Sequence, residues 1–173
     1  TYGQYKQLPS NGMGRCVPFE PGVLEERMVR SKPFISMHPT TFYAKLFLKI
    51  READLKINGR WVDTAADAYF HFPMLEMCAS PERVHFIPDV LYYYQEQDPK
   101  RFISEEYALQ VFMTWNARHK GRYSKLETLD DVPTVEKKDS SDWACIFQTR
   151  ARCYDAKIAT QEVGGEPEPA KPE

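Results

Sequence analysis

The alternation of aromatic and polar residues at the start of the chain predicts a β-strand over residues 1–8. The segment reads TYGQYKQL, and tyrosine is among the residues that favour strands. Residues 9–22 then contain six proline and glycine residues, which predicts a long irregular loop. A loop of this length in a compact domain is usually functional or packed over a neighbouring element.

The next segment shows the spacing of an amphipathic helix. Over residues 39–50, apolar side chains recur every fourth position at Phe42, Leu46 and Ile50. Pro39 suits the first turn of a helix, where its missing N–H costs nothing. We therefore expect a helix over this whole range.

Another helix is predicted over residues 104–119. Ser104 suits its N-cap, the two glutamates that follow complement the positive end of a helix, and Gly121 suits its C-terminal end. Three bulky residues are spaced to share one face of this helix: Tyr107, Val111 and Trp115.

Between these two segments, Asn58-Gly59 is a turn signal, and a further helix is expected to begin near Asp67. That helix should bend around Pro73, because proline removes a backbone hydrogen bond and clashes with the preceding turn. The strands and helices together predict an α/β fold, or an α+β fold if the chain is an isolated piece.

Two β-rich runs follow this helix, at residues 84–87 and 90–94. They are joined by Pro88-Asp89 and form either a strand pair or one strand with a connector. Periodicity in runs this short does not distinguish between the two arrangements.

The C-terminal part of the chain is predicted to be separate from the main domain. Residues 126–160 hold a polar, acidic loop and an amphipathic helix over 143–158. Residues 161–173 are rich in proline and glutamate and are predicted to be disordered. Residues 1–125 are therefore assigned to the main domain.

Composition narrows the classes of function. The 173 residues carry 23 Lys+Arg and 25 Asp+Glu, a net charge of −2, which argues against a dedicated nucleic-acid binder. The longest uncharged apolar stretch, residues 68–75, is too short to span a bilayer, so we expect no transmembrane segment. Four scattered cysteines without zinc-site spacing favour free thiols in the cytosol or an organelle interior, although a disulfide stays open.

Candidate acid–base chemistry lies in the helix predicted to begin near Asp67. Asp67 and His71 are four residues apart and share a helical face. A carboxylate beside apolar side chains can act as a general base. The alternative is a helix-capping aspartate followed by a partly buried histidine.

Two further residues are candidates for substrate binding. His38 precedes a predicted helix and could bind a metal or a phosphate oxygen near its backbone N–H groups, or it is simply a turn histidine. Trp61 and nearby tyrosines could stack on a sugar or a base, and the alternative for them is core packing. The chain has no P-loop, GxGxxG, GxSxG or HExxH motif.

Three motifs occur in order between residues 38 and 95. They read HPTTFYAKLFLKI, then DAYFHFPMLEM beginning at Asp67, then RVHFIPDVLYYYQ. Their order and spacing resemble the C-terminal half of family-2 glycosyltransferases with a GT-A fold, and the opening TYGQY is similar to the strand after that family's metal-binding aspartates. The resemblance covers about residues 1–125 and implies a C-terminal portion of a GT-A-type nucleotide-sugar transferase domain with appended helices.

The resemblance implies that Asp67 is the general base of an inverting sugar transfer from a nucleotide-sugar to a hydroxyl acceptor. It also implies a divalent cation, Mn²⁺ or Mg²⁺, held by an Asp-x-Asp motif in the donor-binding half. His38 matches a motif histidine near the donor or acceptor, and Glu76 matches a position that could support the fold. Against the family pattern, Thr40 replaces an arginine and Gln95 an asparagine.

No Asp-x-Asp motif or βαβ region for a nucleotide precedes the first strand, and the chain opens at Thr1 in strand-like sequence. We therefore expect the acceptor-side half of a glycosyltransferase, completed by an upstream region or a second chain. One alternative is a catalytically inactive glycosyltransferase-like subunit that acts as a scaffold or interaction module. The other is an unrelated, aromatic-rich α+β module.

Overall fold

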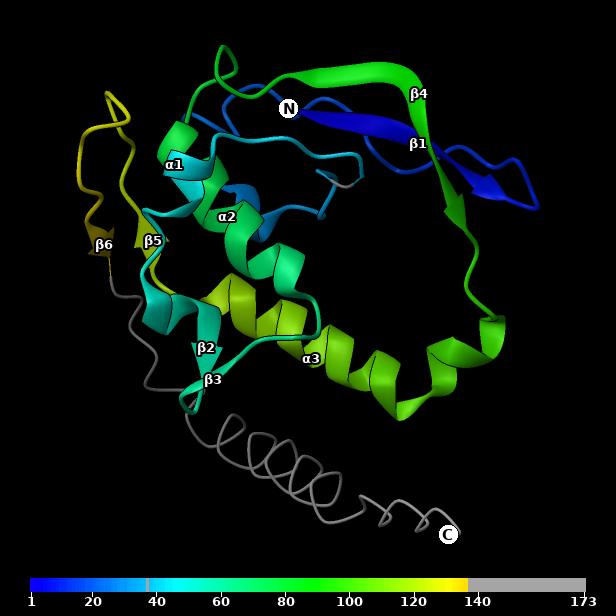
Figure 1. Cartoon of the computed structure of the whole chain (residues 1–173). Helices are drawn as coiled ribbons and strands as arrows, with labels where there is room; N and C mark the ends of the chain where they lie inside the picture. The colour runs from blue at the N-terminus through cyan, green and yellow to red at the C-terminus, as the bar shows by residue number, and fades with distance from the viewer. Residues whose placement is uncertain (37, 137–173) are drawn as a thin grey trace, which may run out of the picture. The chain divides into compact units, whose positions relative to one another are not determined.

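The computed structural model describes residues 1–36 and 38–136. The fold described below is that of the compact unit Thr1–Lys138. It combines small sheets with three α-helices and short 3-10 turns, a mixed α and β structure that is compatible with the α+β class predicted for an isolated piece (Figure 1). The helix predicted over 143–158 and the tail over 161–173 lie outside the described residues.

The main sheet consists of two parallel strands, β1 (Tyr2–Leu8) and β4 (Phe86–Gln95). The predicted first strand is therefore confirmed. The two β-rich runs form one strand instead of a pair, because β4 shifts its register between Ile87 and Val90 and so accommodates Pro88, which has no N–H to donate.

The free edge of β1 bonds to two loop segments. Gly14 N–H donates to the carbonyl of Tyr5 at 2.8 Å, within the predicted loop, and Gly3 N–H donates to the carbonyl of Pro39 at 2.9 Å. The prediction of a helix over the whole of 39–50 is therefore wrong, since its first residues are extended along β1. Helix α1 is limited to Ala44–Phe47.

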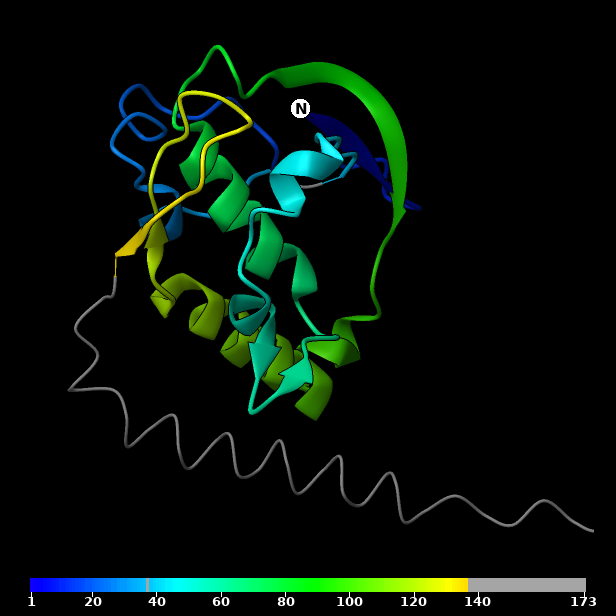
Figure 2. The same cartoon turned by 60° about the vertical axis from the view of Figure 1, so that its left-hand side comes forward.

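Helices α2 (Ala66–Cys78) and α3 (Glu105–His119) pack against each other, and α2 also contacts the 3-10 turn η1 (Val29–Ser31) (Figure 2). α2 begins where predicted, and Pro73 lies buried within it. The Oγ of Ser104 accepts a hydrogen bond from the N–H of Tyr107 at 3.2 Å, which confirms the predicted N-cap. The largest fully buried side chains lie mainly on these helices and β5: Tyr69, Tyr123, Phe72, Met77, Met113 and Glu76.

Short elements complete the unit. The 3-10 turn η2 (Glu52–Leu55) leads into a hairpin of β2 (Lys56–Ile57) and β3 (Arg60–Trp61), which turns at Asn58-Gly59 as predicted. Both turn residues have positive φ, +50° and +81°, as a two-residue hairpin requires. The 3-10 turn η3 (Pro99–Ile103) precedes α3, and β5 (Arg122–Tyr123) pairs with β6 (Val135–Glu136).

Candidate functional site

The first two turns of α2 carry Asp67 and His71. Asp67 is half-buried, and its Oδ1 accepts a hydrogen bond from the N–H of Ala68 at 3.0 Å. The alternative of a capping aspartate does not hold, because the N-cap is Ala65, with a left-handed φ of +54° and no side-chain cap. Asp67 forms no ion pair with any residue of the described ranges, so its carboxylate keeps accepting capacity for a ligand.

His71 is almost completely enclosed, with 6% of its surface exposed. Its ring lies 5.5 Å from the ring of Phe34 and 4.8 Å from that of Phe70. Burial lowers the pKa of His71 to about 4, although the Asp67 carboxylate and a hydrogen bond to the Ser36 backbone oppose this shift. The imidazole is therefore neutral at pH 7, and it leaves the charge of Asp67 uncompensated.

Two buried polar atoms next to this pair have no hydrogen-bond partner within the described residues. They are Nδ1 of His71 and Oγ of Ser36. Both residues line a small cavity of about 50 Å³ beneath β1, which also includes Thr40 and Phe42. Buried polar atoms are normally paired, so these two provide unused hydrogen-bonding capacity within this cavity.

His38 joins this cluster from the segment that runs along β1. It is exposed, and its ring stacks on Tyr94 of β4 at 6.1 Å and 13° and lies 5.6 Å from the ring of Tyr92. Its charge acts on the pKa of His71 in the same direction as burial, which places the two histidines within electrostatic range. The structure therefore brings Asp67, His71 and His38 together, and we call these three residues the Asp67 cluster.

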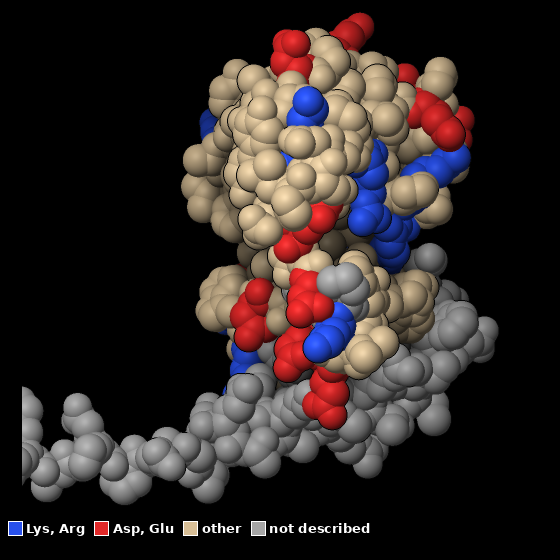
Figure 3. All heavy atoms as spheres, turned by 90° about the vertical axis from the view of Figure 1, so that its right-hand side faces the viewer, with Lys and Arg blue, Asp and Glu red and all other residues tan. Residues whose placement is uncertain are grey.

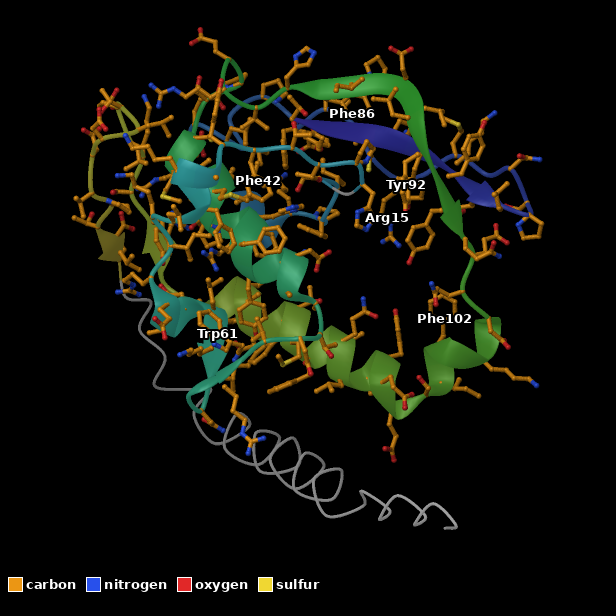
Figure 4. All side chains as sticks on the ribbon, viewed as in Figure 1. Arg15, Phe42, Trp61, Phe86, Tyr92 and Phe102 are labelled. Atoms are coloured by element: carbon orange, nitrogen blue, oxygen red, sulfur yellow. The ribbon has the colours of Figure 1, made fainter. Side chains whose placement is uncertain are left out.

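Trp61 lies apart from the Asp67 cluster, on the β2–β3 hairpin (Figure 4). Its side chain is 58% exposed, and the ammonium group of Lys56 lies 4.4 Å from the centre of its ring. This cation–π contact gives Trp61 a structural partner, and nothing in the geometry joins it to the other predicted site residues.

Sequence reasoning did not single out Ser36, which lines the small cavity together with His71, or Arg15, an exposed arginine in the loop that follows β1. Figure 4 shows Arg15 and Tyr92 extending into the space between the sheet and α3. A hollow lies in the surface on this side of the molecule, with acidic side chains below it and basic ones on one flank (Figure 3). The functional role predicted for the long loop was the only signal that pointed to Arg15.

No three or more His, Cys, Asp or Glu side chains gather to hold a metal ion in the ranges 1–36 and 38–136. Within the same ranges, no helix has the length and apolar character needed to cross a membrane. Comparison of the chain with protein families, with curated proteins and with solved structures found no match.

Proposed function

We propose that this chain is the acceptor-side half of an inverting glycosyltransferase and that Asp67 is its general base. The observation that carries the proposal is the partly exposed side chain of Asp67, whose carboxylate has no ion-pair partner among the described residues and which lies beside a neutral histidine. A general base needs a charged form with a free lone pair and access to the reacting hydroxyl.

In the proposed step, the Asp67 carboxylate takes the proton of an acceptor hydroxyl. The hydroxyl oxygen then forms a bond to the anomeric carbon of a nucleotide-sugar, while the bond from that carbon to the diphosphate breaks and its electrons leave with the diphosphate. Attack from the face opposite the leaving group inverts the anomeric centre. The proton ends on Asp67 and returns to solvent afterwards.

Of the other residues of the Asp67 cluster, the exposed His38 suits the binding of an acceptor. The stacked rings of His38 and Tyr94 offer a flat aromatic surface for a sugar ring. Trp61 has no part in this proposal.

The described residues do not fit the divalent cation that the family resemblance implies, because none of their acidic or histidine side chains form a suitable cluster. In the proposal, the cation therefore belongs with a donor-binding region. The exposed face of β4 supports completion by another region, since Leu91 and Tyr93 are 58% and 59% exposed there. Parallel sheets are normally covered on both faces.

Calorimetric titration of nucleotide-sugars, with and without Mn²⁺, tests this proposal. We expect the 173-residue chain to show no Mn²⁺-dependent donor binding and a longer protein that includes the donor-binding region to bind in the presence of Mn²⁺. Tight, Mn²⁺-dependent donor binding by the 173-residue chain would refute the division into two halves. A longer protein that binds a nucleotide-sugar but transfers nothing would favour the scaffold alternative.

A further inference from the structure

A second cavity, of about 460 Å³, lies where η1, the C-terminal end of α3 and the β5–β6 hairpin meet. Its charged lining is almost entirely basic. The charged side chains are Arg27, Arg30, Arg118, Lys120, Arg122 and Glu136. We call this cavity the basic pocket, and it shares no lining residue with the Asp67 cluster.

Two of its five cations are neutralised by carboxylates. Arg27 donates to Oε1 of Glu136 at 3.0 Å. Arg30 donates from Nε and Nη2 to the two carboxylate oxygens of Glu76, at 2.6 and 2.9 Å. These pairs hold the wall of the pocket in place and contribute little net charge to it.

The other three cations have no carboxylate partner within the described part of the chain. Arg118 donates to the backbone carbonyls of Arg30 and Lys32, and Lys120 donates to those of Lys56 and Ala53. Arg122 is exposed, and its side chain forms no hydrogen bond or ion pair with a described residue. The pocket is thus left with three positive charges.

The negative charges near the pocket are smaller than the positive charge of these three cations. The C-terminal end of α3 contributes a partial negative charge of about one half, and the carbonyl of Ala117 at that end already accepts from Nη1 of Arg30. Asp54 acts on Lys120, but it is itself paired with Arg51 at 2.8 Å. The three uncompensated cations therefore dominate the electrostatic potential of the pocket.

The pKa shifts of Arg118 and Lys120 include repulsion from neighbouring positive charges. Burial, followed by the charge of Arg30, lowers the pKa of Arg118. Burial likewise lowers the pKa of Lys120; the charge of Asp54 opposes this shift, and the charges of Arg30 and Arg51 add to it. An anion in the pocket would relieve this repulsion.

We propose that the basic pocket binds a small anion that carries two or more phosphate groups. Its volume falls within the range of small-molecule sites, and its arginines can bond to phosphate oxygens through paired N–H groups. A half-open pocket of this size on a chain of net charge −2 suits a compact polyanion better than a nucleic-acid strand, which needs an extended basic surface. The inference does not rest on the proposed transferase activity.

Titration calorimetry of the full chain with inorganic pyrophosphate, without added metal, tests the proposal. We expect saturable binding of one pyrophosphate per chain that weakens as salt is raised, because salt screens exposed charges. Arg122→Gln should weaken the affinity by about fivefold or more, since it removes a charge near the anion. Glu136→Gln should strengthen the affinity, since it frees Arg27 from its carboxylate partner.

Lys125→Gln is the matched control. This substitution removes one positive charge, as Arg122→Gln does, at a position three residues from Arg122. Lys125 is exposed and does not line the pocket. The affinity of Lys125→Gln for pyrophosphate should stay within about twofold of that of the unmodified chain, because a distant exposed charge is screened. Absence of saturable binding, or an equal loss in Arg122→Gln and Lys125→Gln, would overturn the proposal. The proposal would also be overturned if an oligonucleotide bound to the pocket more tightly than pyrophosphate does, as measured by its displacement of bound pyrophosphate.

Discussion

Arg30 and Glu76 form a bidentate ion pair in the interior of the protein, with Nε–Oε1 and Nη2–Oε2 distances of 2.6 and 2.9 Å. Glu76 has 0% of its side chain exposed and also accepts a hydrogen bond from the N–H of Tyr123 at 3.0 Å. The pair ties α2 to η1 and to β5. Glu76 therefore has a structural role.

Replacement of Glu76 by glutamine should destabilise the fold. The substitution leaves the Arg30 guanidinium buried without its carboxylate, and the loss of one partner of a buried pair typically costs about 3–5 kcal/mol. Urea denaturation followed by circular dichroism measures the free energy of unfolding. Glu52→Gln is the control, because the Glu52–Lys56 pair is exposed and should contribute no more than about 1 kcal/mol. Equal effects of the two substitutions would contradict this account.

The stability of the fold should fall as the pH drops from about 6.5 to about 4. Burial lowers the pKa of His71 to about 4, whereas a histidine in an unfolded chain titrates near 6.5. Between these values the unfolded chain binds more protons, so the contribution of His71 is fully present above about pH 6.5 and is lost as the pH falls to about 4. Across this range, the free energy of unfolding should fall by about 3 kcal/mol.

The groups that act on His71 electrostatically are Asp67, His38 and the amino group of Thr1. Urea unfolding across this pH range should show a slope that His71→Gln largely removes. His85→Gln, which changes an exposed histidine, should retain the slope. If the pH dependence of His71→Gln matches that of the unmodified chain, His71 is not the titrating group.

Gly14 should tolerate no side chain. A Cβ at this position would lie 2.6 Å from Cζ of the buried Tyr5 ring and closer still to Cε1. Gly14→Ala forces the ring or the loop to move, and overpacking of this kind costs about 1–3 kcal/mol. Gly12→Ala should cost less, because its Cβ meets only the ends of two flexible side chains, at 3.2 Å. Thermal denaturation of the two variants measures these losses of stability. A larger loss in Gly12→Ala than in Gly14→Ala would contradict the packing described.

Local rules predicted those elements whose structure depends on neighbouring residues. Ser104 caps α3 through its own hydroxyl, and Asn58-Gly59 forms the turn that its backbone preferences indicate. The helix expected over 39–50 failed for a non-local reason. Leu46 and Ile50 are buried as their spacing implies, but Phe42 is 44% exposed and the backbone before Leu46 bonds to β1. The apolar spacing therefore predicted burial at two of its three positions and did not predict the extent of the helix.

The candidate site was predictable to a similar extent. The spacing of Asp67 and His71 on one helix follows from the sequence, and so does their proximity. The position of His38 depends on the pairing of its segment with β1 and on the parallel pairing of β1 with β4, two contacts between residues far apart in the chain. The burial that lowers the pKa of His71 depends on Phe34, which no local pattern links to α2.

The rate of sugar transfer by Asp67→Asn tests the central claim most directly. The assay follows release of nucleoside diphosphate from a panel of nucleotide-sugars, with Mn²⁺ and hydroxyl acceptors, by a protein that includes the donor-binding region. Asp89→Asn is the control, because Asp89 is an exposed aspartate on β4 outside the Asp67 cluster. We predict that Asp67→Asn lowers kcat by about a hundredfold or more and leaves donor binding unchanged, while Asp89→Asn keeps its activity. Full transfer activity in Asp67→Asn would contradict the assignment of Asp67 as the general base.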